Sequence, residues 1–279
     1  MKDISGSVTV SKCGNWPIGV CSWSLGNDFD KIAALADQTN LSHIHLAVSP
    51  ALGKKGKDYL ASVQKGRWTI SATMVDFPQE DYSTLESIKA TGGIVPDKYW
   101  QDNKIRVFDA IDLTADLGVK YLSLHFGFID REAHSLAQKL ADRARTLADR
   151  AAKKNITLLM ETGQESAAEL REFLEEINHP SLCVNFDPAN MLLYDKGDPV
   201  EAVETLSSWI KHVHIKDALR TKVLGTWGQE VPWGSGQVGG DKFLHALDKA
   251  GFIGVLTVER EAGDTRFDDI KLAIEKLKR

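Results

Sequence analysis

Four side chains able to bind a metal ion follow one another at regular intervals in the C-terminal half of the chain. They are Glu161, Asp187, His214 and Glu259. The steps from 161 to 187 and from 187 to 214 are each about one β/α repeat long. The step from 214 to 259 contains a Gly- and Trp-rich loop over residues 221–240 and is otherwise similar. This spacing predicts one metal-competent side chain on each of four successive strands.

The residues around these four side chains alternate in the way that strands require. In the segment His212–Lys216, Val213 and Ile215 fall on one face and the polar residues on the other. A buried strand carries an imidazole inward only where the ring meets a partner or a ligand. The alternation is weaker before Glu161, because Leu159 shares its parity. We therefore expect His214 to point toward the other three side chains.

Three carboxylates in one cavity repel one another, which raises their pKa values, and a divalent cation relieves this repulsion. Oxygen ligands with one nitrogen favour Mn²⁺, and would also accept Mg²⁺, Co²⁺ or Zn²⁺, whereas structural zinc sites are rich in thiolates. A lone carboxylate at a strand end is usually a helix cap or a surface residue. Three carboxylates and one histidine in register on neighbouring strands favour a metal site.

The elements that must position these residues repeat as strand and then helix along the whole chain. This repetition predicts a single-domain (β/α)₈ TIM barrel over residues 1–279, with the chemistry at the carboxyl ends of the strands. An open doubly wound sheet would call for G-x-G-x-x-G after the first strand, which residues 21–26 lack. The expected strands cover residues 18–23, 41–48, 68–75, 119–125, 156–160, 181–186, 210–216 and 253–258; the expected helices cover 28–39, 58–65, 81–90, 99–117, 131–154, 165–177, 199–208, 241–250 and 268–277.

The composition is that of one large globular domain. The 279 residues are 43% hydrophobic and 26% charged, and the net charge of −5 opposes nucleic-acid binding. The three cysteines lack C-x-x-C spacing and are expected to be reduced thiols. No secretory segment or apolar run of membrane-spanning length occurs, so a cytoplasmic protein without a membrane partner is expected.

Four motifs together resemble the xylose isomerase-like TIM barrels, and most closely the sugar phosphate isomerase/epimerase branch with its ketose 3-epimerase relatives. The motifs are Met160-Glu161-Thr162-Gly163, Asn185-Phe186-Asp187-Pro188-Ala189-Asn190, His212-Val213-His214-Ile215-Lys216-Asp217 and Val258-Glu259. The resemblance implies that Glu161, Asp187, His214 and Glu259 are the metal ligands. It also implies that Glu161 and Glu259 exchange protons with a substrate carbon on opposite faces, through a metal-stabilised enediolate.

The substrate-binding half of the family pattern is only partly present. Arg220 matches an arginine that ketose epimerases carry six residues after the metal histidine. Asn190 and Ala167 stand where those enzymes have a histidine and a glutamate. The motifs therefore specify the superfamily better than the substrate.

Further side chains are candidates for substrate contacts besides Arg220 and Asn190. Lys216 could hold a substrate anion or pair with a ligand carboxylate, and His125 could line the pocket or be a core histidine. Trp227 lies in the glycine-rich loop, where it could stack on a sugar ring or pack against the barrel. Trp23, at the end of the first strand, could belong to the pocket wall or to the core.

These observations predict a metal-dependent isomerase or epimerase of a sugar, keto-sugar or sugar phosphate. The alternative enzyme is a lyase or dehydratase acting on a keto-sugar or inosose, because both reactions start by removing a proton beside a carbonyl. An endonuclease IV-like nuclease would need more metal ligands and a basic groove. A non-catalytic sugar-binding barrel would have no reason to keep all four ligands. The expected partner is a small carbohydrate, and a homo-oligomer is also compatible with the sequence.

Overall fold

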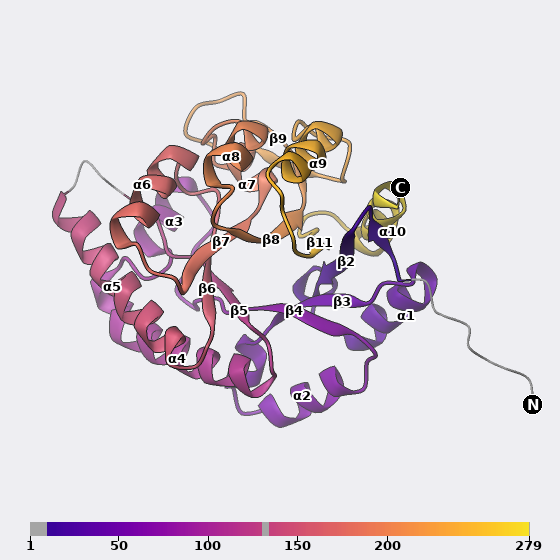
Figure 1. The fold of residues 1–279 in the computed structure, drawn as a ribbon, viewed down its shortest axis with the longest axis horizontal. Helices are drawn as coiled ribbons and strands as arrows, with labels where there is room; N and C mark the ends of the chain where they lie inside the picture. The colour runs from indigo at the N-terminus through magenta and orange to yellow at the C-terminus, as the bar shows by residue number, and fades with distance from the viewer. Residues whose placement is uncertain (1–9, 130–133, 279) are drawn as a thin grey trace, which may run out of the picture.

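The structure is a computed structural model that describes residues 10–129 and 134–278. Within them, eight parallel strands close into a barrel, and the short strand β1 adds to β2 in antiparallel orientation (Figure 1). Around the barrel the order is β2, β11, β8, β7, β6, β5, β4 and β3, and β3 pairs with β2 to complete the ring. The strands are β1 (Lys12–Cys13), β2 (Trp16–Cys21), β3 (His43–Ala47), β4 (Thr69–Met74), β5 (Tyr121–Leu124), β6 (Thr157–Glu161), β7 (Leu182–Phe186), β8 (Ile210–Ile215) and β11 (Leu256–Val258).

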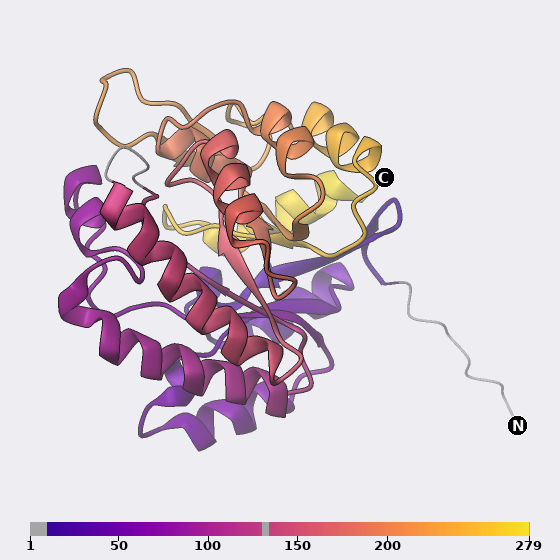
Figure 2. The same ribbon diagram turned by 60° about the vertical axis from the view of Figure 1, so that its left-hand side comes forward.

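Helices surround the barrel and bury their apolar faces against it. The helix α1 (Phe29–Thr39) buries Phe29, Ile32 and Leu35 at helical spacing, and Asp28 caps its first turn. The long helices α4 and α5 lie side by side on the outside of the barrel (Figures 1 and 2). The remaining α-helices follow the same plan: α2 (Gly56–Gln64), α3 (Leu85–Thr91), α4 (Trp100–Asp116), α5 (His134–Ala152), α6 (Ala167–Ile177), α7 (Pro188–Leu193), α8 (Pro199–Leu206), α9 (Gly240–Lys249) and α10 (Arg266–Leu277).

The predicted barrel is confirmed, and the differences lie in short elements. The helix α3 begins at Leu85 rather than at residue 81, because Thr84 and Ser87 form a capping box there. The sequence prediction did not include β1 or the one-and-a-half-turn helix α7. The predicted helix over residues 131–154 begins partly outside the described residues.

The barrel interior is polar, where branched aliphatic residues are usual. Hydrogen bonds between strands that are not neighbours show which side chains point inward. Ser71 on β4 lies 3.0 Å from His212 on β8, and His45 on β3 lies 3.0 Å from His214. The register shifts at Ile44/His45 and at Val184/Asn185, as in β-bulges, which re-aim side chains.

A second sheet forms between the last two barrel strands, with only its second strand inside the loop predicted over residues 221–240. The strands β9 (Asp217–Leu219) and β10 (Gln229–Val231) pair antiparallel beside the barrel mouth. Asp217 anchors the segment after them, because its carboxylate accepts backbone N–H groups of Gly234, Gly236 and Val238 at 2.9–3.1 Å. This anchoring fixes the base of the loop, whereas Leu224 at its tip is 89% exposed.

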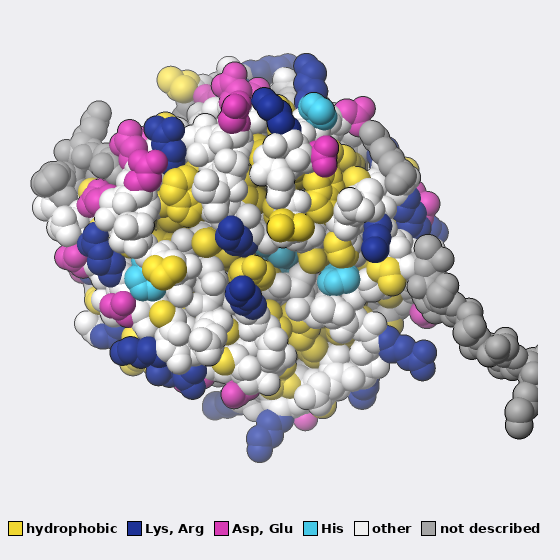
Figure 3. All heavy atoms as spheres, viewed as in Figure 1, with side chains coloured by type: hydrophobic (Ala, Val, Ile, Leu, Met, Phe, Trp, Pro, Cys, Tyr) yellow, Lys and Arg dark blue, Asp and Glu magenta, His cyan; other side chains and the backbone are white. Residues whose placement is uncertain are grey.

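Charges of both signs are interspersed over the face seen in Figure 3. Such mixing gives no extended basic surface on that face for a nucleic-acid backbone. None of the helices in the described ranges combines the length and the apolar character that crossing a membrane requires.

Candidate metal centre

The four predicted ligands meet at the carboxyl end of the barrel. Glu161 ends β6, Asp187 and Glu259 directly follow β7 and β11, and His214 is the next-to-last residue of β8. The Nδ1 atom of His214 lies 3.5 Å from Glu161 Oε1, 3.5 Å from Asp187 Oδ2 and 3.4 Å from Glu259 Oε2. One ligand atom from each residue lies within 4.8 Å of all the others. This separation suits a single six-coordinate ion, whose opposite ligands are about 4.2 Å apart for bonds of ~2.1 Å.

The unpaired polar atoms of the cluster fit a cation. Glu161 Oε2, Asp187 Oδ2, His214 Nδ1 and Glu259 Oε2 are all buried and have no hydrogen-bond partner within residues 10–129 and 134–278. Lys216 Nζ lies 2.8 Å from Glu259 Oε2, but at an angle outside hydrogen-bonding geometry. Buried polar atoms are normally paired, so four orphans in one place need an explanation. Three carboxylate oxygens and one imidazole nitrogen are a donor set that a divalent cation satisfies.

The other oxygen of Glu161 is held by a neighbour. Asn190 Nδ2 donates to Glu161 Oε1 at 3.1 Å. Gly163 allows this approach: its φ is 137°, and a Cβ there would lie 2.4 Å from Asn190 Cβ. Asn190, predicted as a substrate contact, therefore lies in the cavity wall and also orients a ligand.

Asp187 and Glu259 are oriented in the same way, each through one oxygen. Asp187 Oδ1 accepts from the backbone N–H groups of Ala189 and Asn190 and so caps α7, whose first residue is a proline. Trp23 Nε1 donates to Glu259 Oε1 at 2.6 Å. In both residues the second oxygen stays directed at the cluster. Trp23 is thus part of the pocket wall, one of the two alternatives predicted for it.

Electrostatics couple the members of the cluster. Burial alone would lower the pKa of His214, but the neighbouring carboxylates of Glu259 and Glu161 raise it well above its usual value. Burial would likewise raise the pKa of Glu161, yet His214 and His125 hold it well below the usual range. The cluster therefore concentrates negative charge that a cation at its centre would neutralise.

Lys216 already neutralises part of this charge. Its Nζ atom lies 2.8 Å from Glu259 Oε2, 2.7 Å from Glu261 Oε2 and 3.7 Å from Asp187 Oδ2. Although burial opposes it, these carboxylates hold the pKa of Lys216 well above the usual value. Lys216 also lines the cavity, so carboxylate pairing and a substrate contact are both open to it.

A cavity of about 520 Å³ adjoins the cluster, which is a size typical of small-molecule sites. His125 lies in its wall, with Nε2 3.6 Å from Glu161 Oε2 and Nδ1 2.7 Å from the hydroxyl of Tyr82. Burial opposes a charge on His125, but Glu80 and Glu161 hold its pKa well above the usual value. The cavity is lined by Trp23, Asn27, Ala47, Ser49, Pro50, Met74, Asp76, Phe77, Pro78, Glu80, Tyr82, His125, Glu161, Asn190, Tyr194, Lys216, Glu259 and Glu261.

Sequence reasoning missed Glu80 and Tyr82, which follow β4. Glu80 Oε1 accepts from the backbone of Gly93 at 3.0 Å, and Glu80 Oε2 lies 3.5 Å from His125 Nδ1. The available signal was their place directly after a strand, where barrel loops carry functional residues. The helix predicted over residues 81–90 included Tyr82 and began directly after Glu80, so the two residues were not recognised as part of a barrel loop.

Two predicted substrate contacts point elsewhere. The guanidinium of Arg220 bonds to the Asp195 carboxylate and, at 2.7 Å, to the carbonyl of Gly197. Trp227 packs edge-to-face on Tyr194, with 4.7 Å between the ring centroids. Tyr194 lines the cavity, whereas Arg220 and Trp227 do not. Substrate contact by these two residues stays a prediction.

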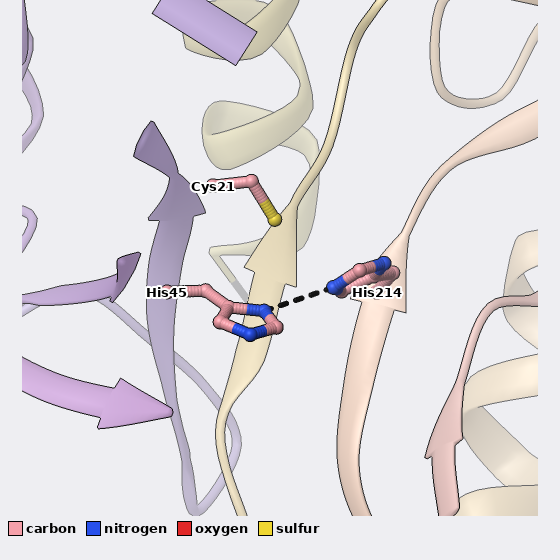
Figure 4. A group of neighbouring side chains, drawn as sticks. All are labelled: Cys21, His45 and His214. Carbon is pink, nitrogen blue, oxygen red and sulfur yellow. Dashed lines mark hydrogen bonds between the residues drawn. The ribbon is translucent and has the colours of Figure 1, made fainter. Parts of the chain in front are cut away.

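Below the cluster lies a second group of buried side chains, Cys21, His45 and His214 (Figure 4). The thiol of Cys21 donates to Thr257 Oγ1 at 3.7 Å, and burial raises its pKa to about 12. Burial and the neighbouring His214 lower the pKa of His45 to about 3. At neutral pH the group therefore contains a neutral thiol and a neutral His45 ring.

Comparison with known proteins identifies the family to which this barrel belongs. Residues 84–279 match the family described as xylose isomerase-like TIM barrel. The chain belongs to this family. No curated protein matches it.

Solved structures of similar proteins cover nearly the whole barrel. A xylose isomerase domain protein from Planctomyces limnophilus is 29% identical, with a TM-score of 0.87 over 94% of this chain and 96% of the other. The probable 3-DHS dehydratase AsbF of Bacillus anthracis is 18% identical, with a TM-score of 0.70 over 94% and 98%. D-psicose 3-epimerase of Clostridium cellulolyticum H10, solved with D-tagatose, is 15% identical, with a TM-score of 0.66 over 93% and 97%. The last two similarities concern the fold alone.

Proposed function

We propose that this protein is a divalent-metal-dependent isomerase or epimerase of a sugar, keto-sugar or sugar phosphate, working by proton transfer beside a carbonyl. One observation carries the proposal. Ligand atoms of the four buried residues Glu161, Asp187, His214 and Glu259 lie within 4.8 Å of one another beside a cavity, and each residue has one polar atom without a hydrogen-bond partner among the described residues. Two of the four residues are glutamates, which can also accept protons from carbon.

The metal would be held by these four residues, with Mn²⁺ favoured and Mg²⁺, Co²⁺ or Zn²⁺ also compatible with the donor set. When bound, a divalent cation polarises a substrate carbonyl, which makes the neighbouring C–H bond more acidic. Four protein ligands leave two octahedral positions for substrate oxygens.

Glu161 and Glu259 would handle the protons. They extend from β6 and β11, which are separated in the barrel by β7 and β8, so they approach the centre from different sides. Asn190 and Trp23 each hold Oε1 of one of these carboxylates, and the two Oε2 atoms accept no hydrogen bond from the described residues. One Oε2 would take the proton from carbon, and the other would return a proton to the opposite face.

The wall of the cavity suits a carbohydrate. Trp23, Tyr82 and Tyr194 supply aromatic surface, and Asn190 and His125 supply polar groups close to Glu161. The similarity to D-psicose 3-epimerase supports a sugar substrate at the level of the fold. Lys216 would contact a substrate oxygen on the side of Glu259.

A specific observation favours elimination as the second candidate. His125 lies 3.6 Å from Glu161 and contacts both Glu80 and Tyr82. A protonated imidazole next to the base could deliver a proton to a leaving hydroxyl. The fold is also shared with a probable dehydratase. A keto-sugar or inosose would then lose water after the same initial proton removal.

Proton NMR in D₂O distinguishes these reactions. The protein would be incubated with Mn²⁺ and a panel of ketoses, sugar phosphates and inososes, and the metal would be removed before spectra are recorded. Epimerisation or isomerisation replaces a C–H by deuterium and retains the carbon skeleton with its oxygens, whereas elimination yields a dehydrated product. Glu161→Gln should abolish exchange, while Glu165→Gln, at a buried glutamate four residues on, should retain it. Full exchange in Glu161→Gln, or no metal bound to the purified protein, would reject the proposal.

A further inference from the structure

His45 lies inside the barrel on β3 and contacts a proposed metal ligand from below. Its ring is fully buried. Its Nδ1 atom lies 3.0 Å from His214 Nε2, as the dashed line in Figure 4 shows, and its Nε2 atom lies 3.1 Å from the carbonyl oxygen of Thr73. The register shift between Ile44 and His45 sets the direction of this side chain.

The direction of these two hydrogen bonds follows from the groups that make them. A carbonyl oxygen only accepts, so the contact with Thr73 requires the proton of His45 on Nε2. The neutral ring carries one N–H, and its Nδ1 is therefore an acceptor. The neighbouring Nε2 of His214 must then donate. When His214 is neutral, as a metal ligand has to be, its Nδ1 therefore carries the lone pair. That lone pair faces the three carboxylates.

A second chain of polar groups fits the same proton on His214. The Ser71 hydroxyl donates to the carbonyl of Ile44 at 3.1 Å, so His212 Nε2 donates to Ser71 Oγ, 3.0 Å away. His212 Nδ1 lies 2.9 Å from the oxygen of the Asn185 amide, and the nitrogen of that amide lies 3.1 Å from His214 Nε2. An amide oxygen and nitrogen have nearly the same shape, and exchanging them makes the amide a donor to His212 and an acceptor from His214. The exchanged amide agrees with a proton on His214 Nε2.

We propose that His45 is a positioning residue of the metal centre, which fixes His214 in the Nε2–H tautomer and presents its Nδ1 to the cation. The inference rests on the function proposed above. Histidine ligands commonly donate their second N–H to a carboxylate or carbonyl. Here a second imidazole, itself oriented by Thr73, takes that place.

The same contact argues against a separate metal ion between Cys21, His45 and His214. The 3.0 Å separation of His45 Nδ1 and His214 Nε2 is that of a hydrogen bond. A metal there would require both nitrogens as lone-pair donors. It would also turn His214 into a bridge between two ions. The hydrogen bond and a second ion exclude each other. The number of metal ions bound per chain therefore distinguishes them: one ion if the hydrogen bond forms, and two if a metal takes its place.

The first test reads the tautomers directly in the full chain. Long-range ¹H–¹⁵N correlation spectra of ¹⁵N-histidine protein loaded with Zn²⁺ should show His45 and His214 protonated at Nε2. Assignment uses spectra of single-histidine variants. A proton on Nδ1 of His45 would overturn the proposal. This measurement needs no variant of His45 to be stable.

The second test compares metal affinity by calorimetric titration with Mn²⁺. His45→Leu fills the space without an acceptor and should weaken binding by about 10–100-fold. His45→Asn places its amide oxygen close to the position of Nδ1, where it can accept from His214 Nε2. This variant should restore most of the affinity. His43→Leu, the same change two residues earlier on the same strand, should bind as the unaltered protein does.

The outcomes separate this inference from the proposed function. If the unaltered protein binds one Mn²⁺ but His45→Leu and His43→Leu bind it equally well, only the role of His45 fails. Two ions per chain, with the second lost in Cys21→Ser, would also overturn that role and leave the proposed function standing. If the unaltered protein binds no divalent cation, both proposals fail.

Discussion

Trp23 and Glu259 are joined by a hydrogen bond of 2.6 Å between residues 236 positions apart in the chain. The contact exists because β2 and β11 are neighbours in the closed barrel. It connects the short 3₁₀ helix directly after the first barrel strand (Ser22–Leu25) to the last proposed metal ligand. The indole N–H fixes one carboxylate oxygen and leaves the other at the centre.

Removing this hydrogen bond should loosen the metal centre. We predict that Trp23→Phe weakens Mn²⁺ binding by roughly tenfold or more, because outer contacts of ligands contribute about 10–100-fold to metal affinity. The matched control is Trp16→Phe, which removes an indole hydrogen bond to the Phe252 carbonyl away from the centre. Calorimetric titration compares the two variants. Equal affinities would show that Trp23 does not orient Glu259.

Metal binding should stabilise the fold, because it neutralises buried carboxylates. At a free Mn²⁺ concentration 100 times the dissociation constant, the gain is ~2.7 kcal/mol. For a chain of this size we expect a rise in melting temperature of about 5–10 °C, reversed by a chelator. Asp187→Asn should lose this response while still capping α7.

Asp198→Asn is its matched control. Asp198 caps α8 through the same two backbone contacts and also precedes a proline. Its variant should respond to Mn²⁺ as the unaltered protein does. A full response to Mn²⁺ in Asp187→Asn, measured by differential scanning calorimetry, would contradict Asp187 as a ligand.

Lys216 should matter most when the metal is absent. Its buried ammonium faces Glu259, Glu261 and Asp187, and breaking a buried ion pair typically costs about 3–5 kcal/mol. We predict that Lys216→Met lowers the free energy of unfolding of the chelated protein by roughly this amount. It should also increase the stabilisation by Mn²⁺.

Chemical denaturation with and without chelator measures both effects. Lys271→Met serves as control, since Lys271 bonds to Gln38 at the surface and its loss should cost less than about 0.5 kcal/mol. An unaltered response to Mn²⁺ in Lys216→Met would indicate that the ammonium does not compensate the ligand charges.

Glu165 should make stability depend on pH. Burial, with a smaller contribution from Glu169, raises the pKa of its carboxyl from 4.5 to about 8. The folded state then holds a proton that the unfolded chain releases above pH 4.5. Its stabilising contribution is complete below pH 4.5, falls as pH rises and is lost above pH 8.

Between pH 5 and 8.5 we expect Glu165 to account for a loss on the order of 3–5 kcal/mol in the free energy of unfolding. Glu165→Gln has the same shape and no charge, so it should remove this part of the pH dependence. Urea denaturation of the chelated protein at both pH values checks this. Parallel pH profiles for the two proteins would be inconsistent with a protonated Glu165.

The sequence predicted the barrel and the four clustered side chains because both depend on local periodicity. Strand and helix periods locate each β/α unit, and parallel strands present their carboxyl ends at one rim. Glu161, Asp187, His214 and Glu259 therefore had to lie at similar heights once the barrel closed.

The contacts that orient the ligands depend on which strands become neighbours, and periodicity does not encode that. His45 reaches His214 across the barrel, and Trp23 reaches Glu259 only through ring closure. Arg220 shows the converse. Its position six residues after His214 predicts a substrate contact, but Asp195, in the turn after α7, competes for its guanidinium.

The anchoring of the long loop by Asp217 has a consequence for how such a chain can diverge. Three backbone groups hold the segment after β10 in place, while the tip at Val223 and Leu224 is exposed and takes no part in the metal cluster. The loop can be lengthened or shortened at this tip, and its residues can be exchanged, at little cost to the stability of the barrel. Sequence variation can accumulate there while the cluster of Glu161, Asp187, His214 and Glu259 stays constant.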